Sequence, residues 1–382
     1  MADATIQAPV KRPRLKFIDM ARSIAILLML EGHFVDATLG ENFRSTKQFI
    51  DPDFLAYDVW LEIRGYTSPM FLTMTGMVFV YLLYMNRQSG YFQNQRVRKG
   101  FRRVLELLFW GYFLNPRGFH ILQCIGYGIL GLLLVYGIYK LVKVIPLWVY
   151  YFVISLLIFS CYAPLSELRI DGEKVPWPFG FPEFIQNMFS APRSQFPLAP
   201  NLGYTFFGAG LGVLLHQNWL RNYKWNISIF LVTLGAILAF FSYDIMEFLH
   251  YKFLYFFGFG INDFLAAKWL FEIQGWVLMI LGLLASLEKI ITIPDGLFLK
   301  IGQNTLSIFV VHMMILYGAV IHIGITTFFS RSGNALNPYE AAIGAALFIT
   351  LFVFMIKYLE PLTNLMHRAL DFIFPFRKRF RK

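Results

Sequence analysis

Ten long apolar segments dominate the chain, and they limit what it can fold into more than any other feature. Each is bounded by charged residues, Pro or Gly. A helix of ~20 apolar residues spans the hydrocarbon core of a bilayer. Only 15% of the residues are charged, against about 25% in soluble domains. We therefore predict an all-α polytopic membrane protein with transmembrane helices near 17–39, 65–86, 100–114, 119–139, 144–162, 197–216, 225–243, 269–287, 299–322 and 341–359.

The distribution of basic residues predicts the orientation of these helices. If the N-terminus is inside, the inner loops hold about twice as many Lys and Arg as the outer loops, as the positive-inside rule requires. Both chain ends are then cytoplasmic. Residues 1–16 and 367–382 are expected to form basic cytoplasmic tails, and 17–366 a single transmembrane domain.

The formal net charge of +11 has two interpretations: the protein binds nucleic acid, or its basic loops face anionic lipid. For a membrane protein we favour lipid, and we expect no nucleic-acid partner. Two cysteines, Cys124 and Cys161, are too few for a disulfide framework or a metal site, so no metal is expected.

The first span is unusual because ionisable residues interrupt it. A charge near the bilayer centre costs roughly 2.5 to 3.5 kcal/mol on insertion scales, so such residues are candidate functional groups. Arg22 and His33 share one helix face, about 16 Å apart along the axis, with the arginine toward the cytoplasm. The ionisable residues of this span are Asp19, Arg22, Glu31, His33 and Asp36.

The neighbours of His33 and Arg22 on this helix favour a functional role over a purely structural one. Asp36 lies three residues after His33 and is placed to hold its second ring nitrogen. Asp19 lies three residues before Arg22 and is placed to pair with it. Glu31 lies on a different face and is expected to have another partner.

Two further residues have open roles. His312, in the ninth span, would meet His33 near mid-depth if the two helices are neighbours, but a structural role is equally open. Gln123 shares a face of the fourth span with Tyr127 and is a candidate for lining a cavity, with helix packing as the alternative. Gly208 and Gly212 form a GxxxG pair that favours close helix packing.

A basic cluster precedes the third span and consists of Arg98, Lys99, Arg102 and Arg103. A helix N-terminus surrounded by guanidinium groups is suited to phosphate. The alternative is ordinary topology with lipid headgroup binding. A polyanionic donor docked here would extend an acyl thioester past Arg22 to His33. The imidazole would then act as general base or as a nucleophile that forms an acyl-imidazole.

Several segments carry a family resemblance. Arg22 and His33 match an R-x10-H pattern, and the first span resembles the opening of the transmembrane acyltransferase superfamily. The branch typified by heparan-α-glucosaminide N-acetyltransferase is the most similar. The segments, in chain order, are FIDMARSIAILLMLEGHF, TSPMFLTMTGMVFVYLL, HILQCIGYGIL, QFPLAPNLGYTFFGAGLG and IGQNTLSIFVVH.

The resemblance implies a cytoplasmic coenzyme A thioester as donor and an acceptor on the far side. It implies that His33 is catalytic and that Arg22 and the basic cluster contact the donor. The sequence departs from the pattern at four positions: Ser23 follows Arg22 where Gly is usual, and Glu31, Cys124 and Asn201 replace Asp, Arg and Trp.

Together these observations predict an acyl-CoA-dependent membrane acyltransferase. It would transfer an acyl group to a sugar or a lipid-linked glycan, and acetyl is the acyl group that we expect. The expected catalytic residues are His33, Asp36 and His312, and the expected donor contacts are Arg22, Arg98, Lys99, Arg102, Arg103 and Gln123.

The alternative is a transporter in which Arg22, His33 and His312 form a proton or anion pathway. It would favour inverted repeats, which the sequence does not clearly contain. We expect a bacterial cytoplasmic membrane as the location, membrane lipids as partners, and a homodimer among the assemblies to test.

Overall fold

A computed structural model describes residues 15–44, 55–116, 118–162, 182–189, 194–257, 265, 267–319, 322–329 and 334–373. Of the described residues 81% are helical, and these ranges contain no β-strand, which confirms the all-α prediction. The elements are α1 (Lys16–Thr38), the 3-10 turn η1 (Glu41–Phe43), α2 (Leu55–Gly65), α3 (Thr67–Tyr84), α4 (Gln95–Leu114), α5 (Ile121–Val142), α6 (Leu147–Ser160), α8 (Glu183–Phe189), α9 (Leu198–Leu214), α10 (Asn218–Arg221), α11 (Asn226–Phe257), α13 (Lys268–Ile290), α14 (Leu297–Gln303), α15 (Thr305–Tyr317), α16 (Ile325–Phe328) and α17 (Pro338–Ile373).

Nine of the ten predicted spans each overlap mainly one helix, and the ninth overlaps the pair α14 and α15, but length and hydropathy alone support fewer crossings than ten. Within the described residues, 5 helices are long and apolar enough to cross a membrane, or up to 6 if the bent pair α14–α15 counts as one span. The ionisable residues of α1 lower its mean hydropathy, and α6 has only 14 residues. Ten spans and the orientation of the chain ends therefore stay predictions.

The predicted tails lie only partly within the described residues. Residues 1–14 and 374–382 lie outside them. The predicted C-terminal tail begins at 367, but α17 continues as a helix to Ile373.

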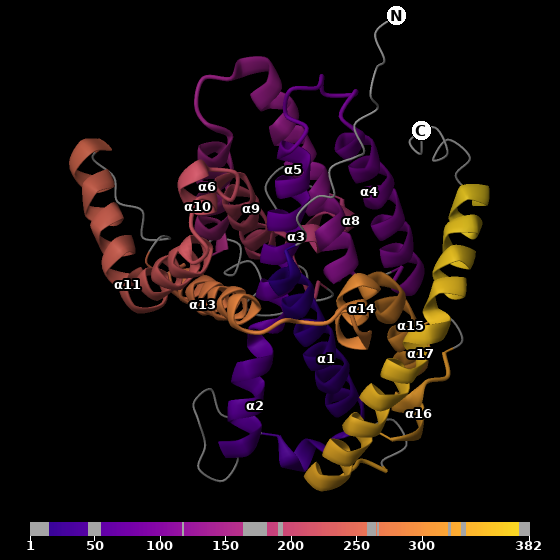
Figure 1. Cartoon of the computed structure of the whole chain (residues 1–382). Helices are drawn as coiled ribbons and strands as arrows, with labels where there is room; N and C mark the ends of the chain where they lie inside the picture. The colour runs from indigo at the N-terminus through magenta and orange to yellow at the C-terminus, as the bar shows by residue number, and fades with distance from the viewer. Residues whose placement is uncertain are drawn as a thin grey trace, which may run out of the picture.

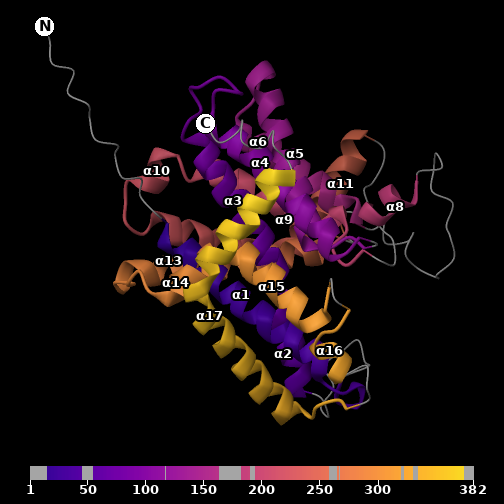
Figure 2. The same cartoon turned by 90° about the vertical axis from the view of Figure 1, so that its right-hand side faces the viewer.

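Helix α1 lies at the centre of the fold. It contacts α3, α13, α14, α15 and α17, and both views show the long α17 running beside it (Figures 1 and 2). The Glu288 carboxylate of α13 accepts hydrogen bonds from the backbone N–H groups of Lys16 at 3.3 Å and Phe17 at 2.9 Å. These bonds satisfy N–H groups that a helix start leaves without partners, and so hold the beginning of α1 in place.

The ninth predicted span is not one continuous helix, which corrects the prediction for 299–322. It is broken between α14 and α15 with a bend of 82°. Asn304 stands at the break, a residue with low helix propensity. The backbone N–H of Gly302 donates to the Ser23 hydroxyl at 3.0 Å, and an added Cβ there would overlap the Asp19 carbonyl. Close docking of α14 on α1 therefore turns the chain before α15 begins.

Helices α3 and α9 pack at backbone contact, as the GxxxG pair predicts. An added Cβ on Gly208 would overlap the Thr73 carbonyl oxygen, and one on Gly212 would overlap that of Met77. Gly76 meets the Thr205 carbonyl oxygen from the opposite side. Small residues permit this close approach between membrane helices.

We expect Gly208→Ala to destabilise the protein, because its methyl group would meet backbone atoms that cannot rotate away. Overpacking costs typically ~1 to 3 kcal/mol. Thermal unfolding of the purified protein in detergent measures the loss. The matched control is Gly137→Ala, whose Cβ meets only ordinary contacts with the Tyr91 ring. Equal melting temperatures for the two variants would contradict this packing.

Candidate active site

One face of α1 lines three cavities in succession. The mouth cavity, of about 310 Å³, is lined by Ile18, Asp19 and Arg22 of this helix and by Leu15 just before it. The arginine cavity, of about 220 Å³, is lined by Arg22, Ile26 and Met29, and the histidine cavity, of about 590 Å³, by Leu28, Met29, His33 and Asp36. Because Arg22 and Met29 each belong to two cavities, the three follow one another along the helix. From residue 15 to residue 36 they cover about 32 Å, close to the thickness of a bilayer core.

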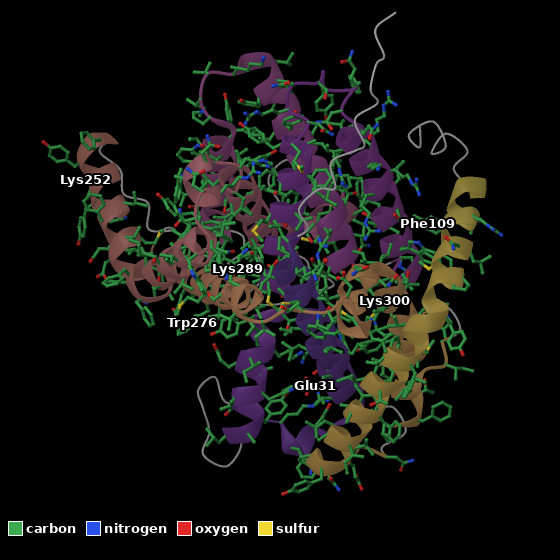
Figure 3. All side chains as sticks on the ribbon, in the orientation of Figure 1. Glu31, Phe109, Lys252, Trp276, Lys289 and Lys300 are labelled. Carbon is green, nitrogen blue, oxygen red and sulfur yellow. The ribbon has the colours of Figure 1, made fainter. Side chains whose placement is uncertain are left out.

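The two ends of this series lie far apart in the fold. Figure 3 shows Glu31 in the lower part of α1, and Lys300 of α14 well above it. Helix α14 docks on α1 at Ser23, next to Arg22. The mouth cavity and the histidine cavity therefore lie toward opposite ends of α1, with the arginine cavity between them, as the spacing of Arg22 and His33 predicts.

In the histidine cavity, His33 is held by Tyr317, a residue at the end of α15. The tyrosine hydroxyl lies 3.1 Å from Nδ1 of His33 and 3.5 Å from the carbonyl oxygen of the same residue. That carbonyl can only accept a hydrogen bond. If the hydroxyl donates to it, Nδ1–H donates to the tyrosine oxygen, and Nε2 is left unprotonated. This arrangement presents Nε2 as a base or nucleophile.

His312 lies beside His33, as predicted for neighbouring helices. The two ring centroids are 5.2 Å apart with an interplanar angle of 31°, and His312 is fully buried. Its Nδ1 lies 3.1 Å from the Ile308 carbonyl oxygen, so Nδ1 must carry the proton that it donates. The Nε2 atom is buried, with no hydrogen-bond partner among the described residues.

Asp36 has a different partner from the one expected. The sequence predicts a hydrogen bond to His33, but the carboxylate instead forms a two-pronged ion pair with Arg64 of α2, with Nη1 and Oδ1 at 2.6 Å and a second, shorter contact. An added Cβ on Gly32 would lie 2.8 Å from Nε of Arg64. The glycine therefore leaves the space through which the arginine reaches Asp36.

A second pair of contacts extends this polar group. The guanidinium carbon of Arg64 lies 5.2 Å from the centroid of the Trp60 ring. The Trp60 indole N–H donates to Glu31 at 2.5 Å. Glu31 therefore has its own partner on α2, as its position on a separate face predicts. Of these side chains, Asp36 and Arg64 line the histidine cavity, and Trp60 and Glu31 support Arg64 from outside it.

In the arginine cavity, three cations converge: Arg22 from α1, and Arg96 and Arg103 from α4. Arg22 pairs with Asp19 at 3.9 Å, which confirms the predicted contact. Arg103 pairs with Glu106 at 3.2 Å. The charged side chains among the described lining residues are all basic, so the cavity is suited to an anion.

The predicted basic cluster is only partly gathered at this cavity. Arg103 lines it, whereas Arg98 donates from Nε to the Phe92 carbonyl oxygen at 3.1 Å. Lys99 is exposed and Arg102 half-buried. Neither these two nor Arg98 is among the residues that line the arginine cavity.

Gln123 lies at the start of α5, where its side chain caps the helix. Its Oε1 accepts from the His120 backbone N–H at 2.7 Å, and its Nε2 donates to the Gly118 carbonyl oxygen at 3.0 Å. His120 in turn lines the histidine cavity. The amide of Gln123 thus holds the backbone of His120 in place, but Gln123 itself lines neither the arginine cavity nor the histidine cavity.

Sequence reasoning missed Tyr317, Arg64 and Arg96 as site residues. Tyr317 and Arg64 reach α1 from helices distant in sequence, so their positions depend on tertiary packing. A signal did exist for Arg96, which lies seven residues, or about two turns, before Arg103 on the same helix face. The described residues contain no group of three or more His, Cys, Asp or Glu that could hold a metal ion.

The family model described as heparan-alpha-glucosaminide N-acetyltransferase, catalytic, matches residues 14–242. The match includes α1 with Arg22 and His33, and α4 with Arg96 and Arg103. No curated protein matches the sequence.

Proposed function

Because the chain belongs to the heparan-alpha-glucosaminide N-acetyltransferase catalytic family, we propose that it is a membrane acyltransferase that uses acyl-CoA, with acetyl-CoA as the first donor to test. The acceptor would be a sugar or lipid-linked glycan on the other side of the membrane. The observation that carries this proposal is the series of three cavities along one face of α1.

The donor would enter from the cytoplasmic side through the mouth cavity. Its phosphates carry several negative charges, which Arg22, Arg96 and Arg103 are suited to neutralise. Its thioester would extend along α1 toward His33. The wider basic cluster of Arg98, Lys99 and Arg102 would then raise the local donor concentration through its field rather than by contact.

The reaction at the histidine cavity would use Nε2 of His33. As general base it would take the proton of the acceptor amine or hydroxyl while that group attacks the thioester carbonyl. The carbon–sulfur bond would break, and the coenzyme A thiolate would receive the proton from the imidazolium. In the nucleophilic route, Nε2 would attack the thioester carbonyl, and the carbon–sulfur bond would break with release of the coenzyme A thiolate. The acceptor would then attack the acyl-imidazole, the bond from Nε2 to the acyl carbon would break, and the acceptor proton would pass to the thiolate. His312 would pack beside the ring, and Asp36 would hold Arg64 at the cavity wall.

The size and lining of the histidine cavity favour a polar acceptor. Its volume of about 590 Å³ lies within the range of small-ligand pockets. Asn115, His120 and Gln195 line it together with the Asp36–Arg64 pair. Amide, imidazole and charged groups are the donors and acceptors that sugar hydroxyls require.

The test uses purified protein reconstituted in liposomes, with acetyl-CoA on one side only and glucosamine trapped on the other. We expect N-acetylglucosamine to form in the acceptor compartment and free coenzyme A to form in the donor compartment, as measured by mass spectrometry. Transport of intact donor without acetylation would instead support the transporter hypothesis. Absence of both donor binding and product would refute the acyltransferase.

We expect Tyr317→Phe to lower kcat roughly tenfold, the effect of losing one hydrogen bond to a group that becomes charged. The phenyl ring keeps the packing but removes the oxygen that holds Nδ1 of His33. A change in the pH profile of kcat would separate this role from a structural one. The control is Tyr151→Phe, which removes a buried hydroxyl bonded to the Leu132 carbonyl, and which we expect to leave the profile unchanged.

A further inference from the structure

The arginine cavity and the histidine cavity meet at four apolar side chains. Met29, Phe71, Ile121 and Phe309 line both cavities. They come from four different helices, α1, α3, α5 and α15. We call these four side chains the partition. Because none of them offers a hydrogen bond of ordinary strength, water that crosses from one cavity to the other would lose its partners there.

The partition lies next to the imidazoles. Met29 is four residues before His33, or about 6 Å along α1, and seven residues after Arg22, or about 10 Å. The Phe309 ring lies edge-on to His312, with centroids 4.9 Å apart, and 5.9 Å from the His120 ring. The partition therefore lies between the imidazoles and the arginine cavity, from which a donor would arrive.

We propose that the partition is a hydrophobic seal. It keeps water and small ions from passing between the two cavities. Hydrophobic constrictions stop conduction by dewetting. The seal opens only when a slender, mostly uncharged chain, the pantetheine arm of the donor, passes between the four side chains.

Two consequences follow from the position of the seal. Cavities placed end to end through a membrane would leak ions if they were continuous, and the partition interrupts them. It also keeps water from the arginine side away from a thioester held at His33, so that transfer outcompetes hydrolysis. The passage of the donor arm rests on the proposed function, whereas the barrier to ions does not.

The first test measures ion leak in the absence of any substrate. Met29→Gln keeps the size of the side chain but makes it polar. Proteoliposomes containing it should dissipate a pH gradient roughly tenfold faster than wild type, the change that ~1.4 kcal/mol off the crossing barrier gives. The matched control is Met313→Gln, at a methionine that lines only the histidine cavity. Equal leak from wild type and Met29→Gln would overturn the proposal.

A second pair of variants keeps the proposal testable if Met29→Gln does not fold. Phe309→Ala removes the ring at the partition, whereas Phe352→Ala removes a fully buried ring of α17 that lines neither cavity. Leak specific to Phe309→Ala supports the seal. Leak that is equal in both, or absent from both, overturns it.

The acceptor-free hydrolysis of acetyl-CoA separates this proposal from the acyltransferase function. If wild type binds donor, Phe309→Ala should hydrolyse it faster, and unchanged hydrolysis would remove the protective role. If wild type does not bind donor but the partition variants still leak, the seal stands and the acyltransferase proposal falls.

Discussion

Replacing His33 with alanine is expected to reduce acetyl transfer by ~10²- to 10⁴-fold, the contribution of a positioned general base. Donor binding should stay within a few-fold of wild type, since His33 lines the histidine cavity and not the arginine cavity. Steady-state transfer and equilibrium binding of acetyl-CoA, measured on the same preparation, separate the two quantities.

The prediction concerns one atom of the ring. Tyr317 contacts Nδ1 of His33, so the proposal places the chemistry at Nε2. Glutamine at position 33 keeps a polar group of similar size but provides no base, and we expect it to be as inactive as alanine. His250→Ala is the control, because this histidine of α11 lines neither cavity. Turnover that survives in both His33 variants would refute the catalytic assignment.

A covalent acetyl-His33 intermediate would distinguish nucleophilic catalysis by His33 from general-base catalysis. If His33 is a nucleophile, wild-type protein incubated with acetyl-CoA and no acceptor should gain one acetyl group on His33. Rapid denaturation followed by peptide mass spectrometry detects it. If His33 is only a base, the peptide stays unmodified while transfer proceeds normally once acceptor is added.

The spacing within α1 was the most informative part of the sequence. A helix is periodic, so residues three, four, seven or eleven apart fall on one face whatever the rest of the fold does. For this reason the relative placement of Arg22 and His33, and the Asp19–Arg22 pair, were predictable before any tertiary contact was known.

Contacts between helices were not predictable in this way. Asp36 has the spacing for a bond to His33, but Arg64 forms a two-pronged ion pair with it, and charge-assisted pairs are stronger than neutral hydrogen bonds. Likewise, residues 299–322 have the hydropathy of one span. The bend between α14 and α15 depends on the docking of Gly302 against Ser23, which hydropathy does not reveal.

The basic cluster before the third predicted span was only partly predictable from the sequence. Its charges predicted an anion site at the correct end of α4, and Arg103 does line the arginine cavity. On a helix, however, consecutive basic residues point in different directions. Arg98 therefore lies on the other side of α4 from Arg96 and Arg103, whereas Lys99 has the spacing to share their side but is exposed and does not line the cavity. Sequence alone left open which of these residues would converge with Arg22.

Replacing Arg22 with alanine is expected to weaken acetyl-CoA binding by roughly 10- to 100-fold, the effect of removing one charge-assisted hydrogen bond of ~1.5 to 3 kcal/mol. Arg22 belongs to both the mouth cavity and the arginine cavity, so a donor that follows the proposed route to His33 passes it. At saturating donor, kcat should fall much less than it does in the His33 variants. Isothermal titration with acetyl-CoA measures the loss.

The charge of Arg22 can be separated from its shape. Arg22→Lys keeps the charge but loses the planar fork that matches phosphate, so it should bind between wild type and alanine. Added salt should weaken wild-type binding more than it weakens that of Arg22→Ala, because one fewer ionic contact remains to be screened. Lys289→Ala is the control, since Lys289, at the end of α13, lines none of the three cavities. If Arg22→Ala and Lys289→Ala bind donor equally well, the donor does not pass along this face of α1.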